Sequence, residues 1–161
     1  MQDERSLYPQ VFPSIKKEIP EAKFKIIGAN PRQELFEATK DIDGIEITGR
    51  IDDVREYMKD CKVSVCPVKI AGGIQNKILE AMSMAIPVVT TPEGAEGIGA
   101  EESILTVAKT NEEYVQKVIN LLKNKDLQQG IGKKSREFIL NNFSWKNVGE
   151  NWDKMIQEVC K

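Results

Sequence analysis

Residues 66–98 read CPVKIAGGIQNKILEAMSMAIPVVTTPEGAEGI, and this stretch decides the fold. It begins at the end of a short apolar run, 63–67, and passes through a glycine pair into a segment with helical periodicity, 74–85. A second apolar run rich in β-branched residues follows at 87–91. Such runs predict strands, and two strands joined by a helix form a parallel crossover unit. The stretch therefore predicts two neighbouring parallel strands.

The same alternation extends through the rest of the 161 residues. Strands are predicted over 23–28, 45–49, 63–67, 87–91 and 104–107. Helices are predicted over 13–19, 31–40, 52–60, 74–85, 110–123 and 126–141, with a last helix capped by Ser144. Short apolar strands that alternate with helices indicate a parallel sheet covered on both faces, and right-handed crossovers favour a doubly wound arrangement. The predicted fold class is α/β, with a Rossmann-like, mostly parallel sheet in one domain over residues 1–161.

The composition of the chain excludes several functional classes. The formal net charge is −2, which disfavours a general nucleic-acid binder, so no nucleic-acid partner is expected. The chain has no histidine, which excludes Ser-His-Asp and Cys-His nucleophile systems and His-ligated metals. The cysteines Cys61, Cys66 and Cys160 match no zinc spacing, and we expect Cys61 and Cys66 to be buried free thiols. Free thiols, no membrane-spanning run and no signal peptide predict a cytoplasmic protein.

Glycines gather in the loops after the predicted strands, where a doubly wound fold binds its ligands. These glycines are Gly28, Gly49, Gly72, Gly73, Gly94 and Gly97. Gly72 and Gly73 precede the helix over 74–85, whose unpaired N–H groups and partial positive charge attract an anion. A diphosphate at that helix end, with Glu80 accepting bonds from sugar hydroxyls, is the ligand that the pattern favours.

The helical wheel of this segment separates two arcs. Lys77 and Glu80 project from one side. The arc expected to be buried consists of Ile74, Ile78, Ala81, Met82 and Ala85. Structural explanations exist beside the functional ones. Glu80 can be read as a solvated helix residue, Lys77 as a surface lysine or as an ion pair with Glu80, and a glycine pair usually marks only a loop. Trp145 and Trp152 are expected to pack among the terminal helices.

The run NKILEAMSMAIPVVTTPEGAEGI, over 76–98, resembles the nucleotide-sugar-binding segment of retaining GT-B glycosyltransferases of the glycosyltransferase-4 type. Gly49-Arg50 and the sequence FSW at 143–145 fit the same pattern. The resemblance implies that the chain is the carboxy-terminal, donor-binding half of a two-domain GT-B fold. The amino-terminal acceptor domain, and the first strand of the donor half before Leu7, are expected to be absent, so we expect the chain alone to be inactive.

The resemblance also implies roles for individual residues. Glu80 would bind the donor ribose, Lys69 and Lys77 would contact the phosphates, and backbone groups at Gly49-Arg50 would hold the nucleobase. The family's first acid, eight positions before Glu80, falls on Gly72, so recognition of the hexose must differ here. Catalytic residues stay unassigned. The substrate-binding residues predicted in this way are Glu80, Lys77, Lys69, Gly72, Gly73, Ile74, Gly49, Arg50, Gly28 and Gly94.

The activity implied by the resemblance is retaining transfer of a hexose from a UDP- or GDP-sugar to a glycan or lipid-linked acceptor in surface polysaccharide synthesis. No cofactor and no metal are expected. The acceptor would bind through the missing domain, and the full-length enzyme would associate peripherally with the inner face of the membrane.

The alternative is a non-catalytic doubly wound module that binds a nucleotide or a protein. A receiver-type domain is disfavoured because Gly28 and Cys66-Pro67 stand where its acidic residues would follow the strands. A dinucleotide-binding dehydrogenase is disfavoured because no G-x-G-x-x-G follows the first predicted strand.

Overall fold

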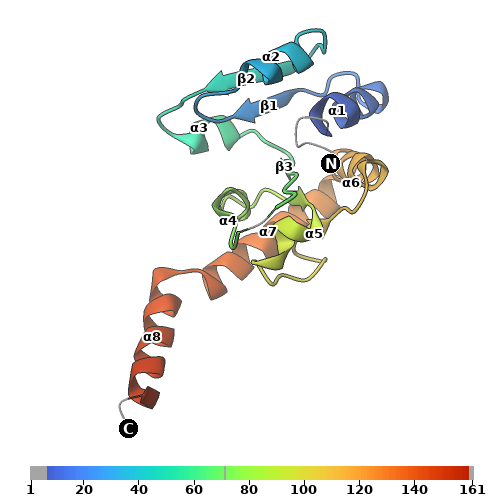
Figure 1. Ribbon diagram of the computed structural model, residues 1–161. Coiled ribbons are helices and arrows are strands. Elements are labelled where there is room, and N and C mark those ends of the chain that lie inside the picture. The colour runs from blue at the N-terminus through green and yellow to red at the C-terminus, as the bar shows by residue number, and fades with distance from the viewer. Residues whose placement is uncertain (1–6, 71, 160–161) are drawn as a thin grey trace.

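The computed structural model describes residues 7–70 and 72–159 (Figure 1). The strands are β1 (Phe24–Ile27), β2 (Ile45–Gly49), β3 (Ser64–Cys66), β4 (Val88–Thr90) and β5 (Thr106–Val107). The helices are α1 (Leu7–Glu18), α2 (Gln33–Thr39), α3 (Val54–Met58), α4 (Asn76–Ser83), α5 (Pro92–Glu96), α6 (Asn111–Lys123), α7 (Lys125–Asn142) and α8 (Trp145–Val159).

All strand pairs in the described residues are parallel, as the sequence predicted. The strands form two sheets rather than the single sheet expected: one has the order β1-β2, and the other has the order β3-β4-β5. The pairing of β3 with β4 sets Val65 opposite Val89. This confirms the parallel crossover unit predicted from residues 66–98.

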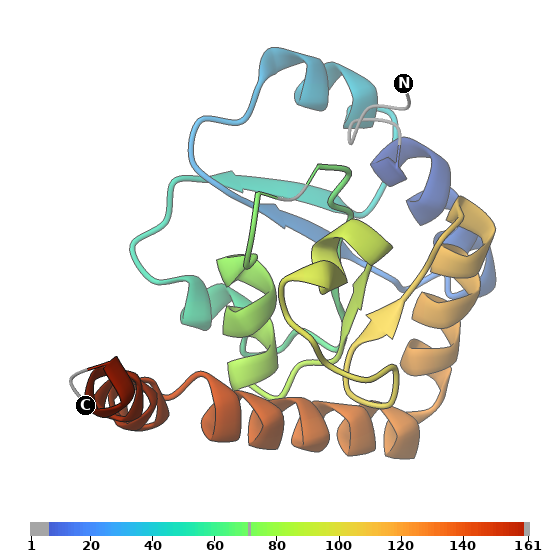
Figure 2. The same cartoon turned by 60° about the horizontal axis from the view of Figure 1, so that its bottom comes forward.

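Helices cover both faces of these strands, and each face has its own apolar cluster (Figure 2). On one face α1 packs against α6, and on the other α4 packs against α7. The buried residues of the α4–α7 cluster are Met58, Cys66, Val68, Ile78, Ala81, Met82, Ile86, Val88, Ile98, Leu105 and Ile139. The buried residues of the α1–α6 cluster are Val11, Ile15, Val89, Ala108, Tyr114, Val118, Ile119 and Leu121. Strand β4 lies between the clusters and is buried along its whole length.

One predicted helix boundary and one predicted strand boundary are wrong. The first helix was expected to begin at Pro13, but α1 begins at Leu7 and carries Pro13 inside it. Burial of Val11, Phe12 and Ile15 against the core offsets the cost of an internal proline. Strand β5 contains only two residues instead of the four predicted over 104–107, because the backbone N–H of Leu105 turns back to donate to the carbonyl of Glu101.

Helix α4 is also shorter than the predicted helix over 74–85. Two residues of the arc that was expected to be buried therefore lie outside it: Ile74 is 50% exposed, and Ala85 is exposed with a φ of 59°. The other three members, Ile78, Ala81 and Met82, are fully buried as predicted. The short helix α5 was not predicted, although Thr91-Pro92 carries its signal, because the Thr91 hydroxyl caps the helix and proline suits its first turn.

Helix α8 projects away from the rest of the molecule in Figure 1. The expectation that Trp145 and Trp152 pack among the terminal helices is wrong, since their exposed fractions are 90% and 61%. Met155, Ile156 and Val159 are exposed on the same helix. Ser144 caps α8 as predicted, because its hydroxyl accepts from the Asn147 N–H at 3.3 Å.

The prediction of buried free thiols is confirmed for Cys66 and in part for Cys61. Cys66 is buried and Cys61 is half-buried, and both are free thiols. Cys61 donates a hydrogen bond to the carbonyl oxygen of Val63 at 3.1 Å, and burial raises the pKa of its thiol. Cys160 lies outside the described residues.

Candidate functional site

The residues predicted to bind a donor lie in the loops that follow four parallel strands or in the helices that those loops enter. Gly28 follows β1, Gly49-Arg50 ends β2, the 67–75 loop follows β3, and Gly94 lies in α5 after β4. Parallel strands bring their carboxyl ends to one edge of a sheet, and a doubly wound fold binds ligands outside that edge. The topology therefore places all the predicted site loops on the carboxyl-end side of their strands.

The loop between β3 and α4 has an open backbone. Gly73 has a φ of 123°, a conformation that favours glycine, and a Cβ at Gly72 or Gly73 would meet no atom within 4 Å. The helix itself begins three residues later, at Asn76. Its N-cap residue Gln75 makes no side-chain cap and instead donates from its amide to the Gly73 carbonyl at 3.0 Å. The amino end of α4 thus keeps its positive dipole end without a side-chain cap.

Lys69 brings a cation into the same loop. Its Nζ atom is buried and has no hydrogen-bond partner in the described structure. Because an ammonium group taken out of water needs a compensating partner, this arrangement favours binding of an anion. The residue directly before it, Val68, is fixed by the Thr91 hydroxyl, which donates to the Val68 carbonyl oxygen. Lys69 is therefore held at its base by the core and unpartnered at its charged end.

Lys77 and Glu80 lie on α4 with exposed side chains. No ion pair joins these two residues, which removes the ion-pair explanation of their spacing. Glu80 is four residues into the helix, which at 1.5 Å per residue sets it about 6 Å further along the axis than the first helical residue, Asn76. Its carboxylate is free to accept bonds from hydroxyl groups.

Helix α5 supports the glycine loop from behind. A Cβ on Gly97 would lie 3.0 Å from the Gly73 carbonyl carbon and from the Ile74 nitrogen, so the two backbones are in contact. Gly94 faces inward instead, because it is buried and a Cβ there would overlap the Thr90 hydroxyl. The structure thus gives Gly94 a packing role, and its contact with a donor stays a prediction. No role for Gly97 followed from the sequence, although the glycine-rich loop around it was a signal.

The loops after β1 and β2 carry the remaining predicted residues. Gly49 has a φ of 70°, and a Cβ at Gly28 or Gly49 would meet nothing within 4 Å. Arg50 is exposed and follows directly. Beyond it, hydrogen bonds from the Arg55 guanidinium, at 2.7 and 2.9 Å, hold the pKa of Asp53 below its ordinary value. The Asp53 carboxylate is thereby engaged in capping α3, which leaves Arg50 as the basic side chain and Asp52 as a second, exposed carboxylate at this loop.

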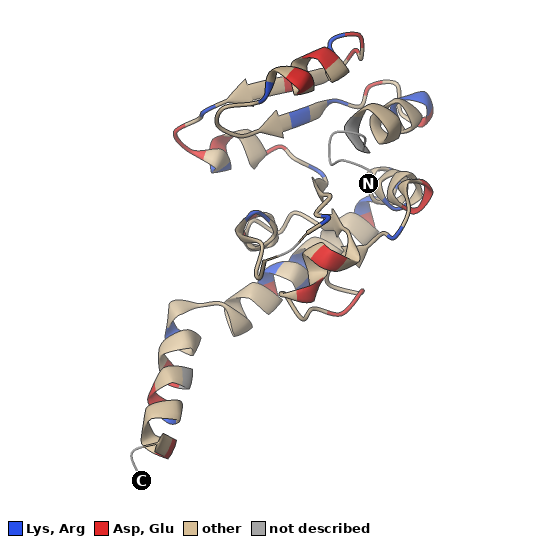
Figure 3. Cartoon of the chain, in the orientation of Figure 1, with Lys and Arg blue, Asp and Glu red and all other residues tan. Residues whose placement is uncertain are grey.

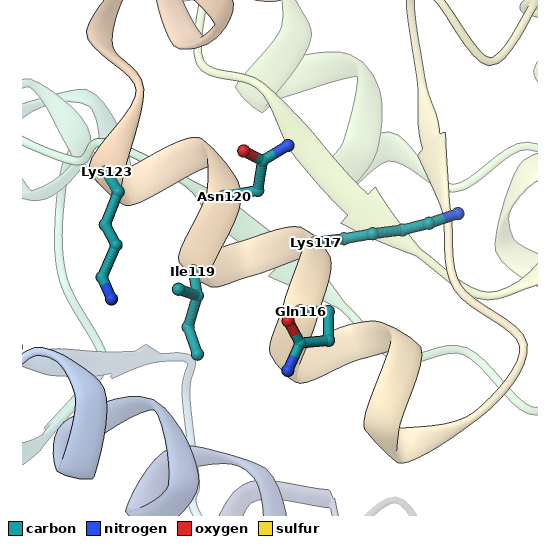
Figure 4. A pocket seen from close by; sticks show the side chains of 5 residues that line it. All are labelled: Gln116, Lys117, Ile119, Asn120 and Lys123. Carbon is teal, nitrogen blue, oxygen red and sulfur yellow. The ribbon is translucent and has the colours of Figure 1, made fainter.

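A hollow of about 450 Å³ lies elsewhere, along α6 (Figure 4). Its lining residues are Gln116, Lys117, Ile119, Asn120 and Lys123. The side chains fan out from the helix in Figure 4, and both lysines are engaged: Lys117 donates to the Val107 carbonyl oxygen, and Lys123 pairs with Glu18 at 3.0 Å. This hollow has no unpartnered charge, and it carries none of the predicted site residues.

The charged residues as a whole are interspersed by sign along the chain (Figure 3). Across residues 7–70 and 72–159, no three His, Cys, Asp or Glu side chains gather as ligands for a metal ion. The expectation of metal-independent chemistry stays a prediction. Within the same residues, no helix has the length and apolar character needed to cross a bilayer.

Comparison with known proteins identifies the family of this chain. The sequence matches the family described as glycosyl transferases group 1 over residues 5–124. The chain belongs to this family. Among the curated members, it is 26% identical over 121 residues to the uncharacterized glycosyltransferase MJ1069 of Methanocaldococcus jannaschii. That alignment covers 72% of this chain and 31% of the relative, so the group 1 chain spans about a third of the relative's length.

Solved structures share the fold of this group 1 chain. The structure of S. aureus TarM in complex with fondaparinux, α-GlcNAc-glycerol and UDP superposes with a TM-score of 0.82 at 20% identity, covering 94% of this chain and 32% of TarM. The carboxy-terminal domain of the group 1 protein LpcC from Francisella tularensis superposes with a TM-score of 0.73 at 19% identity, covering 88% of this chain and 78% of that domain. These matches confirm the α/β, GT-B-type fold class predicted from the sequence.

Proposed function

We propose that this chain is the donor-binding domain of a retaining, metal-independent glycosyltransferase that moves a hexose from a UDP- or GDP-sugar to a glycan or lipid-linked acceptor. The observation that carries the proposal is the buried, unpartnered ammonium of Lys69 in the loop before the amino end of α4. A cation and a helix dipole in one glycine-lined loop fit a diphosphate. Family membership supports glycosyl transfer as the reaction, with the acceptor bound by polypeptide outside this chain.

The proposed chemical task of this site is to stabilise the departing nucleoside diphosphate. As the bond between sugar and phosphate breaks, negative charge grows on the phosphate oxygen. Fixed positive groups are most effective when they are in place before the charge develops. Lys69 would stabilise this charge from the buried side of the loop and Lys77 from its exposed side. The first N–H groups of α4 would donate hydrogen bonds to the same phosphate. Gly72 and Gly73 would let the phosphates approach the backbone closely.

Glu80 is proposed to hold the ribose. Its carboxylate stands one helical turn beyond the amino end of α4, far enough to avoid the phosphates and near enough to reach the adjoining sugar. Two ribose hydroxyls donating to one carboxylate make charge-assisted hydrogen bonds. The base would then lie toward Gly49-Arg50 at the end of β2, where backbone groups are open. UDP in the TarM structure supports a uridine donor as the first candidate.

Calorimetric titration of the 161-residue chain with UDP, GDP and ADP tests the donor site. We expect one of the three nucleotides to bind, and binding of none contradicts the proposal. Lys69→Met should weaken that binding, whereas Lys134→Met, on an exposed face of α7, should leave it unchanged.

The ribose assignment has a sharper test. Glu80→Gln should weaken binding of the preferred diphosphate about tenfold or more, because a charged hydrogen bond contributes about 1.5–3 kcal/mol. The 2′,3′-dideoxy analogue should bind the parent chain and Glu80→Gln equally, since the hydroxyls that Glu80 would hold are gone. Glu137→Gln, an exposed change on α7, serves as the control. A full tenfold loss for the dideoxy analogue on Glu80→Gln would show that Glu80 acts on another part of the donor.

A further inference from the structure

One threonine at the end of β4 makes hydrogen bonds to two parts of the candidate site. The Thr91 hydroxyl donates to the carbonyl oxygen of Val68, the residue directly before Lys69. The same hydroxyl accepts from the Gly94 N–H at 3.3 Å and so caps α5. A hydroxyl group can donate one hydrogen bond and accept others at the same time, so the two bonds are compatible. Thr91 therefore joins the loop after β3 to the helix after β4.

Val68 is held at three points, at its N–H, its side chain and its carbonyl group. Its N–H donates to the Cys66 carbonyl oxygen at 3.0 Å, and its side chain is buried. A Cβ on Gly94 would lie 3.4 Å from the Val68 side chain, so α5 packs directly against this residue. The third point is the hydrogen bond from the Thr91 hydroxyl to the Val68 carbonyl oxygen. The peptide group that leads from Val68 into Lys69 is thus fixed by Thr91.

The planar peptide group carries this constraint to the lysine side chain. Because the peptide C–N bond does not rotate freely, the orientation of the Val68 carbonyl group determines where the Cα of Lys69 lies. The Lys69 Nζ atom is buried, although the next residue, Ile70, is 88% exposed. A lysine side chain is flexible and ordinarily keeps its charged end in water, so a buried ammonium requires a fixed backbone at its base. The hydroxyl of Thr91 supplies that fixed point.

Helix α5 extends the influence of Thr91 to the glycine pair. This helix has only five residues, so its stability depends strongly on the cap that Thr91 provides. Its last turn supports the loop, because a Cβ on Gly97 would lie 3.0 Å from backbone atoms of Gly73 and Ile74. Figure 2 shows α5 beside the loop that joins β3 to α4. One hydroxyl group therefore supports both the lysine and the glycine backbone of the candidate site.

We propose that Thr91 is a positioning residue of the donor site, whose hydroxyl holds the Lys69 ammonium in the place where the anion binds. The identity of that anion, a nucleoside diphosphate, rests on the proposed function. Thr91 acts through bonds inside the protein, to Val68 and Gly94, and Lys69 makes the contact with the phosphate. The strength of the phosphate contact then depends on a hydroxyl group that belongs to a different strand from the lysine.

Thr110 provides a matched control for a role as a helix cap alone. Its hydroxyl accepts from the Glu113 N–H at 3.2 Å and caps α6, as the Thr91 hydroxyl caps α5. Helix α6 carries none of the predicted site residues. Thr110→Val therefore removes a cap of the same kind without changing the base of Lys69.

The position of Lys69 can be measured without a nucleotide. The 161-residue chain is treated with acetic anhydride, and acetylation of Lys69 is followed by peptide mass spectrometry relative to exposed Lys134. Thr91→Val and Thr91→Ala both lack the hydroxyl, and either one suffices if the other fails to fold. Each should raise the relative rate at Lys69 about tenfold or more, because the amine becomes accessible to the reagent. Thr91→Ser, which keeps the hydroxyl, and Thr110→Val should leave the rate unchanged.

Titration calorimetry with the nucleoside diphosphate that binds the parent chain most tightly is the second measurement. Thr91→Val should weaken binding about tenfold, because the charged contact from Lys69 is no longer in place. Thr91→Ser and Thr110→Val should bind as the parent chain does. In a Lys69→Met background, Thr91→Val should cause a much smaller loss, since the group that Thr91 positions is already absent.

Three results would overturn the proposal. Unchanged acetylation of Lys69 in the variants without the Thr91 hydroxyl would show that this hydroxyl does not hold the lysine. An equal rise in Thr110→Val would show that loss of a helix cap anywhere exposes Lys69. Additive losses of binding in the double variant would show that Thr91 acts apart from Lys69. If no nucleotide binds the parent chain, the proposed function fails, and the acetylation rates still decide whether Thr91 positions Lys69.

Discussion

Gly132 of α7 lies directly against the backbone of Ala85, so closely that a Cβ on Gly132 would overlap the Ala85 carbonyl oxygen. This contact joins α7 to the turn that ends α4, and Gly132 is buried in it. Ala85 itself has a φ of 59°. The close contact between this turn and α7 therefore requires a residue without a side chain at position 132.

Gly132→Ala should destabilise the chain by about 1–3 kcal/mol, because the added methyl group forces the turn away from α7. Gly130→Ala is the matched control on the same helix, since a Cβ there would meet nothing within 4 Å. Alanine exceeds glycine in helix propensity, so the control should gain about 0.5–1 kcal/mol. Urea unfolding followed by circular dichroism measures both. A loss of stability in both variants would mean that helix α7 rejects side chains for another reason.

Gly97→Ala should weaken nucleotide binding clearly while lowering the melting temperature only slightly. A Cβ on Gly97 would press on Gly73 and Ile74 at 3.0 Å, and the loop must shift by a fraction of an ångström. We expect a loss of about 1 kcal/mol in binding, close to fivefold in Kd. Titration calorimetry and a thermal melt separate the two effects. Gly149→Ala, with open space around its position, should change neither quantity.

The Thr110 hydroxyl caps α6, so we expect its removal to lower the stability of the chain. Thr110 accepts from the Glu113 N–H at 3.2 Å, and the Glu113 carboxylate accepts from the Lys109 N–H at 2.9 Å. Thr110→Ala should cost about 1 kcal/mol in the free energy of unfolding, whereas Thr110→Ser should be nearly neutral because it keeps the acceptor. Chemical denaturation of the two variants decides the matter. An equal loss for serine would point to the threonine methyl group instead.

Cys61 predicts how stability changes in alkaline solution. Burial raises the pKa of its thiol above the ordinary value of 9.0, so the folded chain holds this proton more tightly than the unfolded chain. The stability contributed by the neutral thiol is present below that ordinary value and is lost as the pH rises through the folded pKa. Unfolding free energies measured from pH 7 to above pH 10 should therefore fall less steeply for Cys61→Ala than for the parent. Parallel curves would assign the alkaline loss to other groups.

The spacing of apolar residues predicted most helices and strands, because that spacing determines which side chains share one face of an element. Thr110 with Glu113, and Ser144, were readable as caps for the same reason. The boundary at Pro13 was not readable, since the burial of Val11 and Phe12 that sustains the longer helix is a tertiary effect. Ile74 and Ala85 were misplaced because a helical wheel assumes that the helix continues.

The loops that carry the predicted site residues follow the strands as the sequence indicated, whereas their binding of a donor stays a prediction. Glycines after strands mark the edge at which a doubly wound fold binds ligands, so Gly28, Gly49 and Gly72 could be placed at that edge from the sequence alone. Nothing in the sequence around Lys69 distinguishes a buried ammonium from a surface one, because its burial depends on how the loop folds over it. The division of the strands into two sheets was equally invisible, since pairing between distant strands leaves no mark on either of them.

Among the described residues, neither apolar cluster contains a residue beyond Phe143, so the described side chains of α8 lie outside the core. We therefore expect cooperative melting of the core and the helix–coil equilibrium of α8 to be separate transitions. A helix of 15 residues is marginal by itself in water. The helical content of residues 145–159 should therefore depend on the apolar surface that the exposed side chains of α8 contact. Calorimetry of core unfolding would not detect a change in that helical content.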